Sequence, residues 1–325
     1  MFIIDDRAVH DTDRHPGIAA CPRRRPTTVA DVRERSAAFV THEGVRSALA
    51  FQPRATDVFI ATYPKSGTTW MQQIVHGLRT GGSMAFAEIT EVVPWVELAF
   101  DMCVDLRSPQ GALPRAFKSH LNWNLIPKGG RYIYVVRDPK DVLVSYYRFY
   151  EGWRFEPGSI SISTFARDLF MKPGAVSWYW SHLASWWEHR YAPNVLVLSY
   201  EEMKDDLRDT VRTVAQFIGC PWDDALLDTI VHQSSIEFML AHREKFDDHL
   251  VRRARDAACD LPPGGTSAKV RNGRVGDSRL ELPRDISEEL DAIWRRTIGP
   301  DLGHRSFDSL RAEIASESRS SLFRA

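Results

Sequence analysis

A short polar loop, residues 63–70 (YPKSGTTW), has the composition and the position of an anion-binding site. It follows the apolar run 58–61, which predicts a buried strand, and precedes a segment with apolar residues four apart, which predicts a helix. Amides at a helix N-terminus lack intrahelical partners, Lys65 adds a full positive charge, and Gly67 allows close approach to the backbone. We therefore expect the loop to bind a phosphate group rather than to be a plain turn.

A second candidate anion site follows the apolar run 131–136, another predicted strand. Arg137 comes directly after this run, and the next residues, Asp138 and Pro139, are typical of a helix start. Parallel sheets bind ligands at the carboxyl ends of their strands, and Ser145 lies two turns along the predicted helix. A guanidinium group suits phosphate, so we predict a second phosphate site here. The alternative is a surface arginine beside a buried serine.

A lysine and a histidine, Lys118 and His120, stand at the end of the short predicted strand 115–118. Residues two apart in a strand lie on the same side, so both side chains are expected to face one ligand. An imidazole has an ordinary pKa of about 6.5 and can accept a proton near neutral pH. His120 is therefore a candidate base, with a purely structural histidine as the alternative. For His182 and His189 we predict packing or surface roles.

These segments resemble the motifs of the cytosolic sulfotransferase family, in the same order, over about residues 57–277. In that family the first loop receives the 5′-phosphosulfate of 3′-phosphoadenosine 5′-phosphosulfate (PAPS). The resemblance implies that Arg137 and Ser145 hold the 3′-phosphate and that His120 is the general base. It also implies that Lys65 stabilises charge on the leaving phosphate oxygen and that Lys118 steadies the sulfuryl group.

Three further segments resemble family motifs that contact the nucleotide. Residues 200–203 (YEEM) match a Tyr-Glu-x-Met segment, and residues 234–239 (SSIEFM) match Thr-Ser-Phe-x-x-Met, with Ile236 in place of the adenine-stacking phenylalanine. Residues 271–278 (RNGRVGDS) match Arg-Lys-Gly-x-x-Gly-Asp-Trp, with Asn272 and Ser278 as departures. The resemblance thus assigns nucleotide binding to Lys65, Ser66, Gly67, Thr68, Thr69, Trp70, Arg137, Ser145, Tyr200, Ser234, Ile236, Arg271, Asn272 and Gly273.

Strands and helices alternate along the chain, which predicts an α/β fold with a central parallel sheet and helices on both faces. A further strand is expected at 194–198, and a single helix at 201–218. We predict a partly flexible N-terminal arm (residues 1–45) and one sulfotransferase domain with a P-loop-like phosphosulfate loop (residues 46–325). The long irregular stretch at about 247–282 is predicted to be a lid. The aspartate pairs 205–206 and 247–248 are predicted to be solvated charges.

Composition excludes several kinds of partner. The chain of 325 residues has 42 Lys and Arg against 43 Asp and Glu, so no global charge recruits nucleic acid. Its four cysteines are widely spaced, which argues against a zinc ribbon or a disulfide scaffold and fits a cytoplasmic protein. No apolar run is long enough to span a membrane, and no signal peptide or bound metal is expected.

We therefore predict a PAPS-dependent sulfotransferase that acts on a hydroxyl of a small apolar or aromatic acceptor. The aromatic residues just after Ser145 are candidates for the acceptor pocket. One alternative is a protein that binds PAPS or its product, adenosine 3′,5′-bisphosphate (PAP), without turnover. Another is a P-loop phosphotransferase, although Lys65 precedes Gly67, unlike in a Walker A motif. The sequence leaves open whether the protein forms a homodimer, since the family's Lys-Thr-Val-Glu dimer motif is absent from the C-terminal region.

Overall fold

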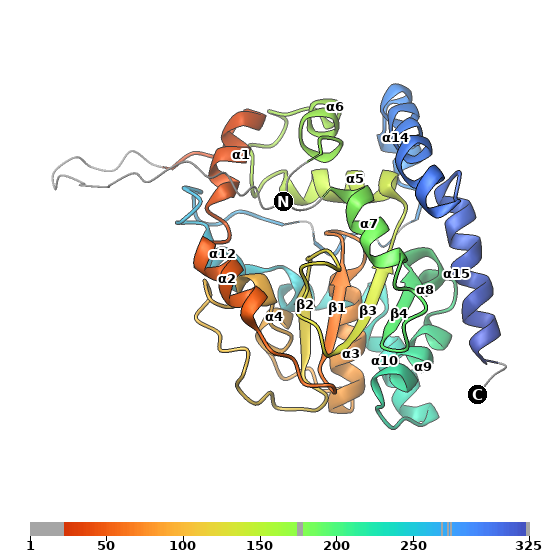
Figure 1. Cartoon of the computed structure of the whole chain (residues 1–325). Coiled ribbons are helices and arrows are strands. Elements are labelled where there is room, and N and C mark those ends of the chain that lie inside the picture. Colours follow the sequence, from red (N-terminus) through yellow and green to blue (C-terminus); the bar gives the residue numbers. More distant parts are fainter. Residues whose placement is uncertain (1–22, 174–177, 268, 272, 274, 323–325) are drawn as a thin grey trace.

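Four apolar segments of the chain form one parallel sheet in the order β2-β1-β3-β4. The computed structural model describes residues 23–173, 178–267, 269–271, 273 and 275–322 (Figure 1). The predicted α/β fold with a central parallel sheet is confirmed. The strands are β1 (Val58–Thr62), β2 (Ala116–Ser119), β3 (Arg131–Val136) and β4 (Val195–Ser199).

Both faces of the sheet are buried, as expected of parallel strands that are covered by helices. On one face, the ring of Phe59 lies 5.5 Å from that of Phe117 and 5.3 Å from that of Tyr132, its neighbours in register. On the other face, Ile60 and Ile133 belong to a separate core cluster. The alternation of side chains along each strand therefore builds two cores, one on each side.

The two cores are closed by different helices (Figure 1). Helices α3, α9 and α10 cover the face of Ile60, whereas α5, α7, α14 and α15 cover the face of Phe59. The longer helices are α1 (Val29–Ala37), α2 (His42–Ala50), α3 (Thr68–Thr80), α5 (Pro139–Tyr150), α7 (Tyr179–Trp187), α9 (Leu207–Ile218), α10 (Asp224–Gln233), α14 (Arg284–Leu302) and α15 (Phe307–Leu322). The shorter ones are α4 (Ile89–Val92), η1 (Val96–Leu98), α6 (Ile162–Phe165), η2 (Ala166–Phe170), α8 (Tyr200–Asp205), α11 (Ile236–Ala241), η3 (Arg243–Phe246), α12 (His249–Arg255) and α13 (Ser278–Glu281).

Two helical segments differ from the sequence expectations. The single helix predicted at 201–218 is two helices, because the backbone leaves helical geometry at Asp206 (φ −140°, ψ 84°). The Asp206 carboxylate accepts a hydrogen bond from the backbone N–H of Asp209 and so caps α9. The segment 247–282 is not wholly irregular, since it contains α12 and α13.

The N-terminal residues that the structure describes pack against the domain. Helix α1 buries Val32, and the turn that follows buries Phe39 and Val40. The boundary expected at residue 45 falls inside α2, and residues 1–22 of the expected arm lie outside the described residues. The division into arm and domain stays a prediction.

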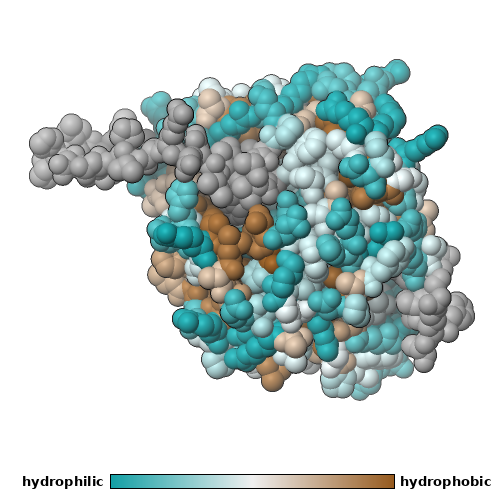
Figure 2. Space-filling model, viewed as in Figure 1, coloured by the Kyte–Doolittle hydropathy of each residue, from teal (hydrophilic) through white to brown (hydrophobic). Residues whose placement is uncertain are grey.

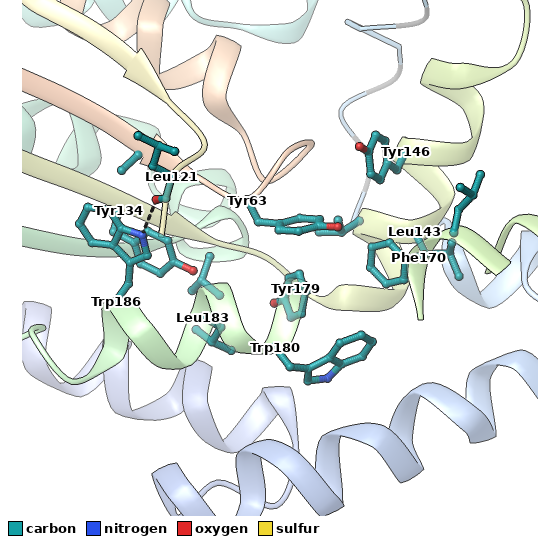
Figure 3. Close-up of a cluster of buried hydrophobic side chains, with 14 of the residues drawn as sticks. Tyr63, Leu121, Tyr134, Leu143, Tyr146, Phe170, Tyr179, Trp180, Leu183 and Trp186 are labelled. Atoms are coloured by element: carbon teal, nitrogen blue, oxygen red, sulfur yellow. Dashed lines mark hydrogen bonds between the residues drawn. The ribbon is translucent and has the colours of Figure 1, made fainter. Parts of the chain in front are cut away.

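The tryptophan-rich helix α7 holds two strand ends in place (Figure 3). The indole of Trp186 stacks on Tyr134 at 5.1 Å and donates a hydrogen bond to the carbonyl oxygen of Leu121 (3.2 Å), just beyond β2. The hydroxyl of Tyr179 donates to the carbonyl oxygen of Arg137 (2.6 Å), just beyond β3. His182 is fully buried in this layer, so of the two predicted alternatives, packing or surface, it has the packing role.

The surface differs in character from these cores. The face in Figure 2 is mainly hydrophilic, with hydrophobic residues gathered in a small area near its centre. In the described part of the chain, no helix has both the length and the apolar character that crossing a bilayer requires.

A buried ion pair joins the starts of β1 and β2. The Arg115 guanidinium donates to both carboxylate oxygens of Asp57, at 2.9 and 2.5 Å, and also to the carbonyl oxygen of Leu106. Removing one partner of such a pair leaves an uncompensated charge in the interior, which typically costs about 3–5 kcal/mol.

Replacing Asp57 with asparagine should therefore lower the free energy of unfolding by about 3–5 kcal/mol, measured by urea denaturation. The control is Glu43→Gln, which removes an exposed ion pair with Arg46 and should change stability little. Equal effects of the two substitutions would show that the buried pair does not stabilise the sheet.

Candidate functional site

The four parallel strands end at one edge of the sheet, and each is followed by a residue that lines a common cavity. Lys65 follows β1, His120 follows β2, Arg137 follows β3, and Tyr200 follows β4. This is the edge at which parallel sheets bind ligands, and the cavity has a volume of about 320 Å³. The predicted site residues that line it are Lys65, Gly67, Thr68, Thr69, Trp70, Lys118, His120, Arg137, Ser145, Tyr200, Ser234, Ile236, Arg271 and Gly273.

One of the predicted residues that the structure describes, Ser66, is not part of the cavity lining. Ser66 is fully buried inside its loop, and its hydroxyl oxygen has no hydrogen-bond partner among the described residues. Asn272 lies outside the described residues. The roles of all these residues in binding or catalysis stay predictions.

The loop before α3 is shaped by two residues with left-handed backbone geometry, Lys65 (φ 72°) and Gly67 (φ 101°). A Cβ atom on Gly67 would lie 2.9 Å from the ring of Tyr200, so a side chain would meet both backbone strain and a clash. Glycine therefore lets the loop lie against Tyr200 while α3 starts at Thr68, with its free amides at the cavity.

Two lysines lie in the cavity with their ammonium groups over aromatic rings. Lys65 Nζ is 4.2 Å from the ring centre of Phe149, and Lys118 Nζ is 3.6 Å from that of Trp95. Burial, with the neighbouring Lys269, places the pKa of Lys65 well below its ordinary value and lowers the pKa of Lys118 to about 8. A bound anion would oppose both effects, because a nearby negative charge favours the protonated form of each lysine.

His120 is held with one ring nitrogen fixed by the backbone. Its Nδ1 lies 2.8 Å from the carbonyl oxygen of Thr62, and because a carbonyl only accepts, Nδ1 carries the proton. Nε2 is then the lone-pair nitrogen, and it has no hydrogen-bond partner among the described residues. Burial, and secondly the charge of Lys118, place the His120 pKa well below its ordinary value, so the ring is neutral at pH 7.

The sequence analysis missed a buried ion network beside the lysines. Asp248, predicted to be solvated, is only 2% exposed, and its Oδ1 lies 2.5 Å from Lys269 Nζ. Lys269 Nζ is also 4.0 Å from a carboxylate oxygen of the buried Glu88. Burial alone would raise the pKa of Asp248, but Lys269, Lys118 and Lys65 together lower it. Asp248 is therefore the counter-charge of the lysine cluster.

The other edge of the cavity is formed by Arg137 and the segment around Arg271. The guanidinium of Arg137 lies 4.0 Å from the ring centre of Tyr200 and 3.8 Å from a carboxylate oxygen of Asp141. Asp141 also accepts hydrogen bonds from the backbone N–H groups of Gly276 (2.7 Å) and Ser278 (3.0 Å). Helix α5 thereby fixes residues 276–278 against the site.

Arg271 forms ion pairs in this structure with Asp277 (2.6 Å) and Glu281 (3.0 Å). It lines the cavity, so a phosphate there would compete with these carboxylates for the guanidinium. The indole N–H of Trp70 donates to the carbonyl oxygen of Ser234 (2.8 Å), which joins the two segments expected near the base.

Aromatic side chains line the part of the cavity beyond His120. Aromatic residues just after Ser145 line the same cavity as His120, and their role in an acceptor pocket stays a prediction. Rings from the turn between α1 and α2 and from before η1 also line it, which was not predicted. The aromatic residues of the lining are Phe39, Trp95, Tyr146, Phe149, Tyr150 and Trp153.

The chain also matches a known domain. Residues 55–301 match the family model of the sulfotransferase domain, which is most of the chain. The chain belongs to the sulfotransferase family. The predictions of this family and of an enzyme of the PAPS-dependent sulfotransferase type are confirmed.

Several sulfotransferases are similar to it over most of their length. Luciferin sulfotransferase of Photinus pyralis is 33% identical over 283 residues, covering 76% of this chain and 73% of that protein. Sulfotransferase 1A1 of Rattus norvegicus is 30% identical over 258 residues, covering 74% of this chain and 84% of that protein. The crystal structure of mouse sulfotransferase SULT7A1 complexed with PAP shares the fold (TM-score 0.61, 24% identity, covering 80% of this chain and 90% of that one).

No group of three or more His, Cys, Asp or Glu side chains in the described residues is arranged to hold a metal ion. The charged residues that line the cavity are the basic Lys65, Lys118, Arg137, Arg154, Lys204, Lys269 and Arg271 and the acidic Asp141, Glu237, Asp248 and Asp277.

Replacing Asp248 with asparagine should lower the pKa of Lys118 further below about 8, because a negative charge that faces it is removed. The ¹³Cε resonance of Lys118, followed against pH, measures this. The control is Asp247→Asn, since Asp247 pairs with His249 and Arg252 instead. An identical Lys118 pKa in the two variants would contradict the counter-charge role of Asp248.

Proposed function

We propose that this sulfotransferase moves the sulfuryl group of PAPS to a hydroxyl of a small apolar or aromatic acceptor, with His120 as the general base. The observation that carries the proposal is the meeting of the helix N-terminus, Lys65, Lys118 and His120 in one cavity with aromatic walls. The first three suit a phosphosulfate, and the last can take a proton from the acceptor.

The chain's own groups fit a nucleotide with phosphates at two places. Lys65 and the amides at the start of α3 are suited to the 5′-phosphosulfate. Arg137 and Ser145 are suited to the 3′-phosphate. Within the described part of the chain, the contacts of the two lysine ammonium groups are ring faces, which are weak partners compared with an anion. PAPS, when bound, would supply an activated sulfuryl group.

In the proposed mechanism the protein mainly orients the two substrates and neutralises the negative charge that develops on their oxygens. Sulfuryl transfer is expected to resemble phosphoryl transfer, with a loose in-line transition state whose charge lies on the oxygens. His120 Nε2 accepts the acceptor proton, and the Nδ1–H bond to the Thr62 carbonyl then stabilises the imidazolium. Lys65 and Lys118 neutralise the oxygens around the transferred group. The aromatic lining keeps water out and binds the acceptor.

Residues 247–282 are proposed to act as a lid. They supply Asp248, Lys269, Arg271 and Gly273 to the cavity, so nucleotide binding would act directly on their position. A 3′-phosphate that draws Arg271 from Asp277 and Glu281 is expected to reorder this segment.

PAP should bind more tightly than AMP, because only PAP carries the 3′-phosphate proposed to meet Arg137 and Ser145. Charge-assisted hydrogen bonds contribute about 1.5–3 kcal/mol, so calorimetry should show a difference of at least about tenfold. Arg137→Met should weaken PAP binding and leave AMP nearly unchanged. Equal affinities of the native protein for PAP and AMP would contradict the proposed 3′-phosphate site.

Replacing His120 with asparagine should reduce turnover by about 10²–10⁴-fold, the usual contribution of a general base. PAP affinity should stay near normal, since the imidazole is not proposed to contact the phosphates. Acidic phenols should lose less activity than aliphatic alcohols, because they ionise more easily. Turnover, PAP binding and thermal midpoint are measured on one preparation.

The control for this experiment is His189→Asn, which changes a histidine that stacks on Trp123, away from the cavity. A purely structural His120 would lower the thermal midpoint, and activity would fall only with the folded fraction. A folded His120→Asn protein with near-normal turnover on alcohols would exclude His120 as the base.

A further inference from the structure

A buried arginine that the proposed chemistry does not use, Arg154, lines the aromatic part of the cavity. It is only 4% exposed. Its guanidinium carbon lies 4.1 Å from the ring centre of Phe39 and 4.3 Å from that of Trp153. Its Nη1 donates a hydrogen bond to the Cys259 sulfur at 3.5 Å, and its Nε has no hydrogen-bond partner among the described residues.

The positive charge of Arg154 is poorly compensated. Among the described residues no carboxylate forms an ion pair with it, and its partners are ring faces and a thiol, both weak acceptors. Burial raises the pKa of the nearby Asp256, and the charge of Arg154 acts against that rise, but the Asp256 carboxylate forms its hydrogen bond with the indole N–H of Trp153, at 2.8 Å. Burying a charge is costly unless it is paired and hydrogen-bonded, so this guanidinium is suited to an anionic partner from the cavity.

Two rows of aromatic rings connect Arg154 with the proposed reacting groups. Toward His120 the rings of Phe39 and Trp95 follow one another, with 5.8 Å between these two and 5.0 Å from Trp95 to the imidazole. Toward Lys65 the rings are Trp153 and Phe149, which lie 5.0 Å apart. A flat acceptor with its hydroxyl at His120 can therefore lie along these rings and direct its far end at Arg154.

We propose that Arg154 binds a carboxylate at the far end of the acceptor, so that the preferred acceptors are aromatic hydroxy acids. The planar guanidinium fork matches a carboxylate in two parallel hydrogen bonds, and with the described residues Arg154 uses one of its donors. This inference rests on the proposed sulfuryl transfer for the position of the hydroxyl. It adds a class of substrate to that reaction.

The test uses 4-hydroxyphenyl acids with one to four methylene groups between ring and carboxylate, each paired with its neutral amide. For at least one chain length, kcat/KM of the native enzyme should be about tenfold to hundredfold higher for the acid. Arg154→Gln should abolish this ratio and leave the amide nearly unchanged, and Arg154→Lys should restore part of it. The exposed Arg167, which pairs with Asp285 and Glu289, gives the control Arg167→Gln.

A ratio near one at every chain length in the native enzyme would overturn the proposal. So would an Arg154→Gln variant that loses acid and amide activity equally, because a merely structural arginine does not change the ratio. A second measurement needs neither turnover nor variants: calorimetry, with PAP present, compares the binding of acids and amides that lack the hydroxyl. If the proposal holds, the acids bind more tightly than the amides. Preferred acid binding without sulfation of any phenol would uphold the carboxylate site and refute the proposed function.

Discussion

Several positive charges lie close together at the carboxyl edge of the sheet, and the surrounding residues have to stabilise them. Lys65, Lys118 and Lys269 repel one another in a cavity that water shields poorly. Two buried carboxylates partly compensate this positive charge. Asp248, with a backbone φ of 59°, pairs with Lys269, and Glu88 lies near the same lysine. The electrostatic potential that remains in the cavity still favours an anion. A sulfotransferase needs such a potential because its sulfuryl donor is an anion.

The aromatic residues around the cavity have two physical roles at once. Trp95 and Phe149 present ring faces to the two lysine ammonium groups and also form the wall along which an acceptor would lie. Ring faces hold a cation without neutralising it, unlike a carboxylate at the same place. These ring contacts therefore leave both lysines suited to an anionic ligand.

Local sequence patterns predicted the features of the fold that depend on neighbouring residues. The strand predicted at 131–136 has those limits in the structure, and the helix after Arg137 starts with Asp138 as its cap. The break at Asp206 was not predicted, because apolar periodicity continues across it and only the capping side chain marks it.

The cavity residues that could be predicted from the sequence are those in motifs that follow a strand. Asp248 was misjudged because its burial depends on Lys269, which lies 21 positions later in the chain. The ion pairs of Arg271 and the single weak hydrogen bond of Arg154 likewise arise from tertiary packing. No pattern along the chain reports such contacts, since a charged residue gives the same local signal whether it is paired or not.

Helix α5 carries groups that belong to both halves of the cavity. Asp141 holds the backbone at 276–278, Ser145 faces the proposed nucleotide, and the aromatic residues that follow face the proposed acceptor. A packed helix transmits displacement along its axis as a nearly rigid body. Thermodynamic linkage requires that any effect of nucleotide binding on the affinity for the acceptor be matched by an equal effect of the acceptor on the affinity for the nucleotide.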